Sequence, residues 1–219
     1  MKYLLFLLLA FILTNCKQER NSVSNFEFYP NAITTSIDSF YKQKISILTS
    51  IYNLPKLTKG TSDSIVIRFW PWEAFQPFEN MLEFRLDSNG WKGHHYCSYT
   101  VFTGEGFQYI KRHEDLGDSV LIVKQIIPKC GWNKFSDSLT FFQLRSLPTQ
   151  TFIKNFQYQA ILDGDGFQFE IATKNSYRWI NYSHPSSYSY KECQQIKELV
   201  NMFKRQLGHS YYWPIKRNT

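Results

Sequence analysis

The chain has 219 residues, of which 18% are aromatic and 20% are charged, and its formal net charge is +7. This length suits one large domain or two small ones. Because no Pro/Gly/Ser-rich linker, repeat or charge block divides the sequence, we expect a single domain. The Lys and Arg residues are scattered in runs of at most two, which indicates a solvated basic surface.

The N-terminus predicts export. Lys2 precedes an uncharged run over residues 3–14 (YLLFLLLAFILT), and this layout is typical of a signal peptide. A membrane-spanning helix needs roughly 20 apolar residues, so the run is too short to remain as an anchor. It ends in LTNC at Cys16, which resembles the lipobox of bacterial lipoproteins, with Asn15 in a place that usually holds Gly, Ala or Ser. The resemblance implies cleavage before Cys16 and lipidation of Cys16. An ordinary secretory signal peptide is the alternative.

These features divide the chain into four parts. We assign residues 1–15 to the signal peptide, 16–30 to the lipidated cysteine and a flexible tether, 31–210 to a single domain and 211–219 to a C-terminal tail. Cleavage removes Lys2 and no acidic residue, so the formal charge falls from +7 to +6. This basic balance would suit acidic partners such as anionic lipid headgroups or polysaccharide, but the scattered Lys and Arg residues favour a solvated surface. Nucleic acid is not expected as a partner outside the cytoplasm. No Asp follows the lipidated cysteine, which indicates the outer membrane by resemblance to lipoprotein sorting.

The first part of the domain predicts one helix and a meander of strands. Residues 35–52 carry an apolar stripe at spacings of three and four, and Pro55 prevents continuation. From residue 64 the pattern has a period of two, which indicates half-buried strands. Asn89 and Gly90 are expected to form a type I′ turn, so the strands on either side should pair as a hairpin. The expected strands cover residues 65–69, 81–87, 91–102, 107–111 and 119–127.

The second part of the domain predicts two helices and further strands. A short helix is expected after Gly131 and before Pro148. A capping box of Ser189 and Glu192 should begin an amphipathic helix that Gly208 ends. The expected strands cover residues 160–162, 167–172 and 177–182. The fold class is therefore α+β, an antiparallel sheet of about seven strands covered on one face by helices.

Residues 128–207 carry a further resemblance. They contain PKCGWNKFSDSL, LPTQ and DGDGFQFEIATKNSYRWINYSHP, followed by the amphipathic helix. This stretch resembles uncharacterised lipoproteins of Bacteroidota. Its motifs are mostly structural, so the resemblance implies a fold and a location and assigns no catalytic residue.

Three cysteines remain once Cys16 is lipidated, namely Cys97, Cys130 and Cys193. An odd number in an oxidising compartment permits at most one disulfide. None of the three belongs to a C-x-x-C pair. Buried structural thiols or one bridge are therefore favoured over a nucleophile or a zinc site.

The histidines give weak candidates for chemistry. His94 and His95 are neighbours on an expected strand and so should point to opposite faces, which argues against one shared metal ion, with or without His113. His95 and Cys97 share a face, but nothing in the sequence orients them as a nucleophile and a base. The segment DGDG at residues 163–166 resembles the opening of a calcium loop without its later ligands, and we interpret it as a turn. We predict no catalytic residue, metal or cofactor.

The most unusual segment is RFWPWEAFQPF at residues 68–78. Two prolines break the backbone, so we expect these aromatics to leave the sheet on a loop. Exposed aromatic and charged side chains there would suit binding of a sugar or peptide. A loop folded back over the sheet edge is the alternative. The candidate binding residues are Arg68, Trp70, Trp72, Glu73 and Phe75.

The functional hypothesis is a membrane-tethered lipoprotein that acts as a non-catalytic binding or envelope-interaction module. Its expected partners are the membrane, through the lipid anchor, and an envelope protein, peptide or glycan, with no nucleic acid. A membrane-tethered hydrolase is one alternative. An immunity-like lipoprotein that inhibits an incoming toxin is another.

Overall fold

A computed structural model describes residues 36–60, 65–73, 78–103, 106–109, 121–159, 161 and 164–208. The predicted signal peptide, Cys16 and the tether lie outside the described residues, as does His113. Among the described helices, none is both long and apolar enough to cross a bilayer.

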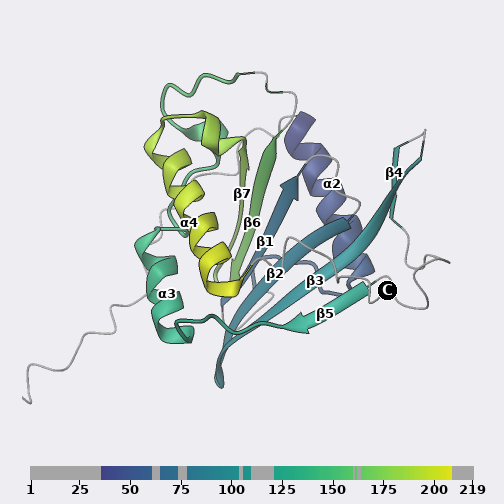
Figure 1. Cartoon of the computed structure of the whole chain (residues 1–219), viewed down its shortest axis with the longest axis vertical. Coiled ribbons are helices and arrows are strands. Elements are labelled where there is room, and N and C mark those ends of the chain that lie inside the picture. Colours follow the sequence, from purple (N-terminus) through teal and green to yellow (C-terminus); the bar gives the residue numbers. More distant parts are fainter. Residues whose placement is uncertain are drawn as a thin grey trace, which may run out of the picture.

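The centre of the fold is an antiparallel sheet whose six strands run in the order β5-β3-β2-β1-β6-β7 (Figure 1). A further strand, β4, pairs only with the far end of β3, so the expectation of about seven strands counts one more than the main sheet holds. The strands are β1 (Ile65–Glu73), β2 (Phe78–Asp87), β3 (Gly90–Thr103), β4 (Gly106–Tyr109), β5 (Leu121–Gln125), β6 (Asp165–Thr173) and β7 (Ser176–Ser183).

Helices cover both faces of the sheet, whereas the sequence predicted one covered face. The helices α3 (Trp132–Phe141) and α4 (Lys191–Leu207) pack on one face, and α2 (Ser36–Ile51) packs on the other (Figure 1). The alternation of side chains along β1 explains the difference. Ile67 and Phe69 belong to the core under α3 and α4, while Trp70 belongs to the core under α2, so each face carries apolar side chains that need cover.

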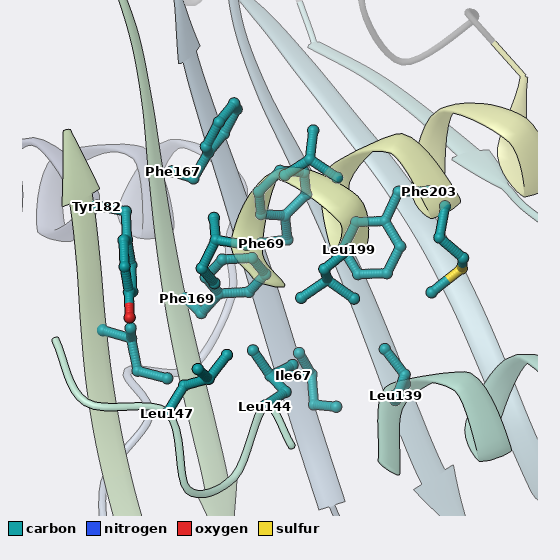
Figure 2. Packing of buried hydrophobic residues seen from close by; sticks show 14 of the residues in the cluster. Ile67, Phe69, Leu139, Leu144, Leu147, Phe167, Phe169, Tyr182, Leu199 and Phe203 are labelled. Carbon is teal, nitrogen blue, oxygen red and sulfur yellow. The ribbon is translucent and has the colours of Figure 1, made fainter. Parts of the chain in front are cut away.

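Aromatic rings fill the larger core, between the sheet and the helices α3 and α4 (Figure 2). The ring of Phe69 lies 4.7 Å from that of Phe169 and 5.1 Å from that of Phe203, measured between centroids. All three side chains have 0% exposure. Burial of each such side chain contributes about 1.5–3 kcal/mol to the stability of the fold. The apolar stripe predicted for α4 is confirmed, because its residues belong to this core and contact the sheet.

The predicted strand order needs two corrections. A meander would pair β5 with β4, but β5 pairs with β3 at residues 94–98, beside the stretch that β4 pairs with. The strand expected at residues 160–162 is not present at Ile161, and its two neighbours lie outside the described residues. Instead β6 pairs with both β1 and β7, a long-range contact that local periodicity does not encode.

Two local predictions about turns and caps were also wrong in detail. The hairpin of β2 and β3 is confirmed, but Asp87 pairs with Gly90, so Ser88 and Asn89 form the turn. Neither has positive φ, so the turn is not type I′. The helix α4 begins after Tyr190, which makes no side-chain cap hydrogen bond, and so Ser189 and Glu192 do not form the capping box. Its end at Gly208, with φ of 79°, is confirmed.

The outer edge of β7 is covered by side chains of the segment before β6. Thr149 Oγ1 donates to the carbonyl of Asn181 and accepts from its N–H, and the Gln150 amide makes the same two kinds of bond with Ser183. These two side chains imitate the pairing of a neighbouring strand. This end of the edge, at Asn181 and Ser183, is therefore not free to pair with another chain.

Candidate functional site

The aromatic segment that the sequence singled out is part of strand β1 up to Glu73, and the prediction of a loop there was wrong. Pro71 lies opposite Phe167 of β6 in the ladder, whereas the pairing of β1 with β2 ends at Phe69 and Leu82. A proline has no backbone N–H, so it cannot donate a hydrogen bond to a neighbouring strand. Pro71 is tolerated because it lies beyond the last pair with β2.

The five predicted binding residues do not form an exposed surface together. Arg68 has 0% exposure and Trp70 has 3%, and Trp72 is partly buried with its ring 5.9 Å from that of Tyr41. The side chain of Glu73, like the whole of Phe75, lies outside the described residues. Arg68 and Trp70 therefore cannot contact a partner directly, although they belong to the floor beneath the site described next.

A row of polar side chains crosses the sheet on the face that α2 covers. The register aligns Glu83, Arg68, Glu170 and Trp179 on four neighbouring strands. Arg68 Nε donates to Glu83 Oε2 at 2.9 Å, and Arg68 Nη1 donates to the carbonyl of Pro55 at 2.9 Å. The row fixes a cation and two carboxylates at buried positions, where each charge needs a partner.

Glu170 is held by two donors from neighbouring strands. Trp70 Nε1 donates to Glu170 Oε2 at 3.0 Å, and the hydroxyl of Tyr177 donates to Glu170 Oε1 at 3.0 Å. Burial raises the pKa of Glu170, and the nearby Arg68 guanidinium offsets part of that rise. Both carboxyl oxygens are thus engaged, and the negative charge of Glu170 is disfavoured relative to an exposed glutamate.

A pocket of about 580 Å³ opens between α2 and the strands β6 and β7. Glu170, Tyr177 and Trp179 contribute to it from the sheet. The contribution of α2 and the turn after it is mostly polar and consists of Lys42, Ser46, Thr49, Ser50, Asn53 and Lys56, with Ile45 and Leu54 between them. A pocket of this size, with an apolar wall and a few polar groups, is typical of small-ligand sites.

The pocket has a cationic rim. Lys42 and Lys56 are exposed residues of the lining, and the Nζ of Lys42 lies 4.9 Å from the centroid of the Trp179 ring. Glu170 is the one acidic residue among the described residues that line the pocket, and its charge is disfavoured by burial. The local potential is therefore positive.

Two buried N–H donors beside Glu170 have no hydrogen-bond partner within the described ranges. They are Nη2 of Arg68 and Nε1 of Trp179, and the register places these residues on either side of Glu170. Buried donors are usually satisfied. Trp179 belongs to the pocket lining, whereas Arg68 lies beneath the pocket and is not part of its lining.

A second polar cluster on the same face is structural. Lys44 Nζ lies 2.7 Å from Glu79 Oε1, with both side chains 9% exposed, and the hydroxyl of Tyr52 donates to the Glu79 carbonyl at 3.0 Å. Burial lowers the pKa of Lys44 and raises the pKa of Glu79. The opposite charge of the partner reduces both shifts. The pair attaches α2 to β2 and does not line the pocket.

The predicted candidates for chemistry are not arranged for catalysis. Cys97 and His95 are both buried in β3; burial raises the pKa of the Cys97 thiol to about 12 and lowers that of His95 to about 4. His95 Nε2 lies 2.9 Å from Asn80 Oδ1. A thiol that stays protonated at neutral pH is a poor nucleophile.

The remaining titratable candidates are also separate. His94 pairs with Glu83, and His95 pairs with Leu82, so the two rings occupy opposite faces of β3. The structure has free thiols rather than the single disulfide that the sequence left open as an alternative. They are Cys97, Cys130 and Cys193. Within the part of the chain that the structure describes, no three His, Cys, Asp or Glu side chains form a metal-binding group.

Sequence reasoning missed the pocket because its residues look ordinary in the sequence. Lys42, Ser46 and Ser50 recur at intervals of four beside the apolar stripe of α2, and the exposed face of almost any helix shows such a row. The position of Trp179 in β7 gave no signal either. Only the pairing of β6 with β1 brings Trp179 and the floor residues Arg68 and Glu170 into one row.

Comparison of the chain with models of known protein families and with curated proteins finds no match.

Proposed function

We propose that the protein is a lipid-anchored binding module of the cell envelope, and that the pocket between α2 and the strands β6 and β7 holds its ligand. The single observation that carries the proposal is the composition of this pocket, with cationic and hydroxyl side chains around an aromatic wall. Such a lining supplies recognition groups. The lining holds no Cys or His among the described residues.

The sequence supports the anchored state. The uncharged run and LTNC at Cys16 resemble a lipoprotein signal, and the resemblance of residues 128–207 to uncharacterised lipoproteins of Bacteroidota points in the same direction. A tether after Cys16 would hold the domain close to its membrane. We place the protein at the outer membrane on the same sorting argument.

A membrane-tethered hydrolase is the second candidate, and Glu170 is the observation that favours it. A carboxyl group whose pKa is raised by burial can serve as a general acid. Glycoside hydrolysis, however, uses two carboxyl groups about 5–9.5 Å apart on either side of the scissile bond. Glu170 is the only carboxylate in the described lining, and its two oxygens already accept hydrogen bonds. Binding is therefore the better-supported function.

The experiment that tests the proposal uses the mature lipoprotein in detergent and fractionated envelope extract. Ser46 lies in the pocket lining and Gln43 is an exposed residue of the same helix outside it, so Ser46→Tyr and Gln43→Tyr form a matched pair. We expect saturable binding of an envelope component by the wild type and by Gln43→Tyr, and its loss in Ser46→Tyr. The bound component should be recovered chemically unchanged. A cleaved product would favour the hydrolase. Equal binding by all three proteins would refute the proposal that the pocket is the binding site.

A further inference from the structure

The pocket also indicates the chemical class of its ligand, and this step rests on the proposed function. We propose that the ligand is an acidic saccharide, a sugar that carries a carboxylate, sulfate or phosphate group. The inference follows from three properties of the lining: its charge, its balance of donors and acceptors, and its combination of an aromatic wall with short hydroxyl side chains.

The charge of the lining selects an anion. Lys42 and Lys56 are exposed at the pocket, and the Nζ of Lys42 lies over the Trp179 ring. Both oxygens of Glu170 are engaged by Trp70 and Tyr177, and burial opposes the ionised form of Glu170. A cation would lose its hydration at this site and gain little in return, whereas an anion would be attracted by both ammonium groups.

The donors of the site need acceptors. Lys42 and Lys56 line the pocket and carry three N–H donors each, and Nε1 of the lining residue Trp179 has no partner among the described residues. A ligand rich in oxygen acceptors suits this surplus. Hydroxyl, ring and acidic oxygens of a charged sugar provide many such acceptors in a small volume.

The aromatic wall distinguishes a sugar from a bare anion. Trp179 supplies an apolar surface at the pocket, while Ser46, Ser50 and Asn53 supply groups that donate and accept hydrogen bonds along α2. A sugar ring has the matching properties, with apolar C–H faces and polar edges, and aromatic side chains with polar neighbours suit such surfaces. Free phosphate would make no use of the Trp179 wall.

The neighbouring edge of the sheet argues against an extended peptide. Peptides often bind by adding a strand to an exposed edge. On β7, the backbone groups of Asn181 and Ser183 are already bonded to the side chains of Thr149 and Gln150. A peptide added along β7 would therefore lack these hydrogen bonds at the end of the strand that follows the pocket residues Tyr177 and Trp179.

The test measures binding of the mature lipoprotein to an array of acidic and neutral glycans, followed by calorimetric titration of the best acidic glycan. Lys42→Gln/Lys56→Gln removes the two pocket charges. Lys129→Gln/Lys134→Gln removes the same charge from exposed residues that do not line the pocket. We expect the pocket pair to weaken binding by about tenfold or more, equivalent to about 1.4 kcal/mol, and the control pair to leave it within about twofold. Circular dichroism and thermal melting establish that both variants are folded.

The outcomes separate this inference from the proposed function. Preferential binding of acidic glycans that Ser46→Tyr abolishes and inorganic phosphate does not compete supports it. If neutral glycans or peptides bind in the pocket and the lysine variants have no effect, the inference fails while the binding function stands. Equal weakening by both lysine pairs would show general charge attraction and overturn the inference. If neither glycan nor envelope component binds, both proposals fail.

Discussion

Arg68 carries a positive charge into the interior of the fold, where its side chain has 0% exposure beneath α2. Its hydrogen bonds to Glu83 and to the Pro55 carbonyl connect β1 with β2 and with the turn after α2. The burial of an arginine depends on partners that are distant in the sequence, and local pattern does not report them.

We expect Arg68→Ala to lower the free energy of unfolding by about 3–5 kcal/mol, because removing one member of a buried ion pair leaves the other charge uncompensated. The matched control is Arg85→Ala. Arg85 lies 3.4 Å from the other oxygen of Glu83 but is 38% exposed, so its loss should cost about 0–1 kcal/mol. Urea denaturation of the two variants measures the difference. Equal losses would show that the burial of Arg68 contributes nothing specific.

His95 gives a second prediction at the residue scale, for stability as a function of pH. Its pKa in the folded protein is lowered to about 4, mainly by burial, against about 6.5 in an unfolded chain. Between these two values the unfolded state binds more protons, so stability falls as the pH falls from about 6.5 to about 4. The free energy of unfolding is therefore higher above pH 6.5 than below pH 4, and the shift of the His95 pKa accounts for about 3 kcal/mol of this difference. His95→Gln should remove this pH dependence in urea denaturation across that range. An unchanged slope would contradict the assignment to His95.

At the scale of elements, the sequence predicts what is periodic and misses what is long-range. The helices α2 and α4 and the hairpin of β2 and β3 were predicted because their stripes and turn are local. The pairing of β6 with β1 and the position of α2 on the opposite face were not, since both depend on contacts across the chain. The pocket lies where these two unpredicted features meet, which is why its residues were not identified.

The cover over the β7 edge provides a prediction at this scale. Gln150 is 4% exposed and bonds both backbone groups of Ser183, so Gln150→Ala leaves a donor and an acceptor unpaired at the edge. Loss of these bonds should lower the free energy of unfolding by about 1–3 kcal/mol. A freed edge should also promote association between copies. Analytical ultracentrifugation over a range of concentrations detects it. Gln194→Ala is the control, because this residue of α4 loses a single bond, to the Tyr188 carbonyl before the helix. Equal self-association of the two variants would exclude the edge as the cause.

At the scale of the whole molecule, the proposed anchor and the proposed ligand pocket would act together. The described part of the chain has a core on each face of the sheet, and the whole chain has a formal charge of +7. On our proposal, this basic balance would keep the domain near anionic envelope surfaces. A domain anchored there would meet its ligand at high local concentration, which would let a small pocket of modest affinity remain occupied.

The final prediction concerns the anchor itself. One acyl chain holds a protein to a bilayer only marginally, whereas the lipoprotein modification that LTNC at Cys16 implies carries several. We therefore expect the wild-type protein to remain with the membrane fraction of its host after washing with high salt, and to enter the detergent phase on phase separation. Cys16→Ala cannot receive the lipid and should leave the detergent phase. Cys130→Ala is the control, because Cys130 is a free thiol of the folded domain and its loss should not change the partition. Full retention of Cys16→Ala in the detergent phase would refute lipidation at Cys16.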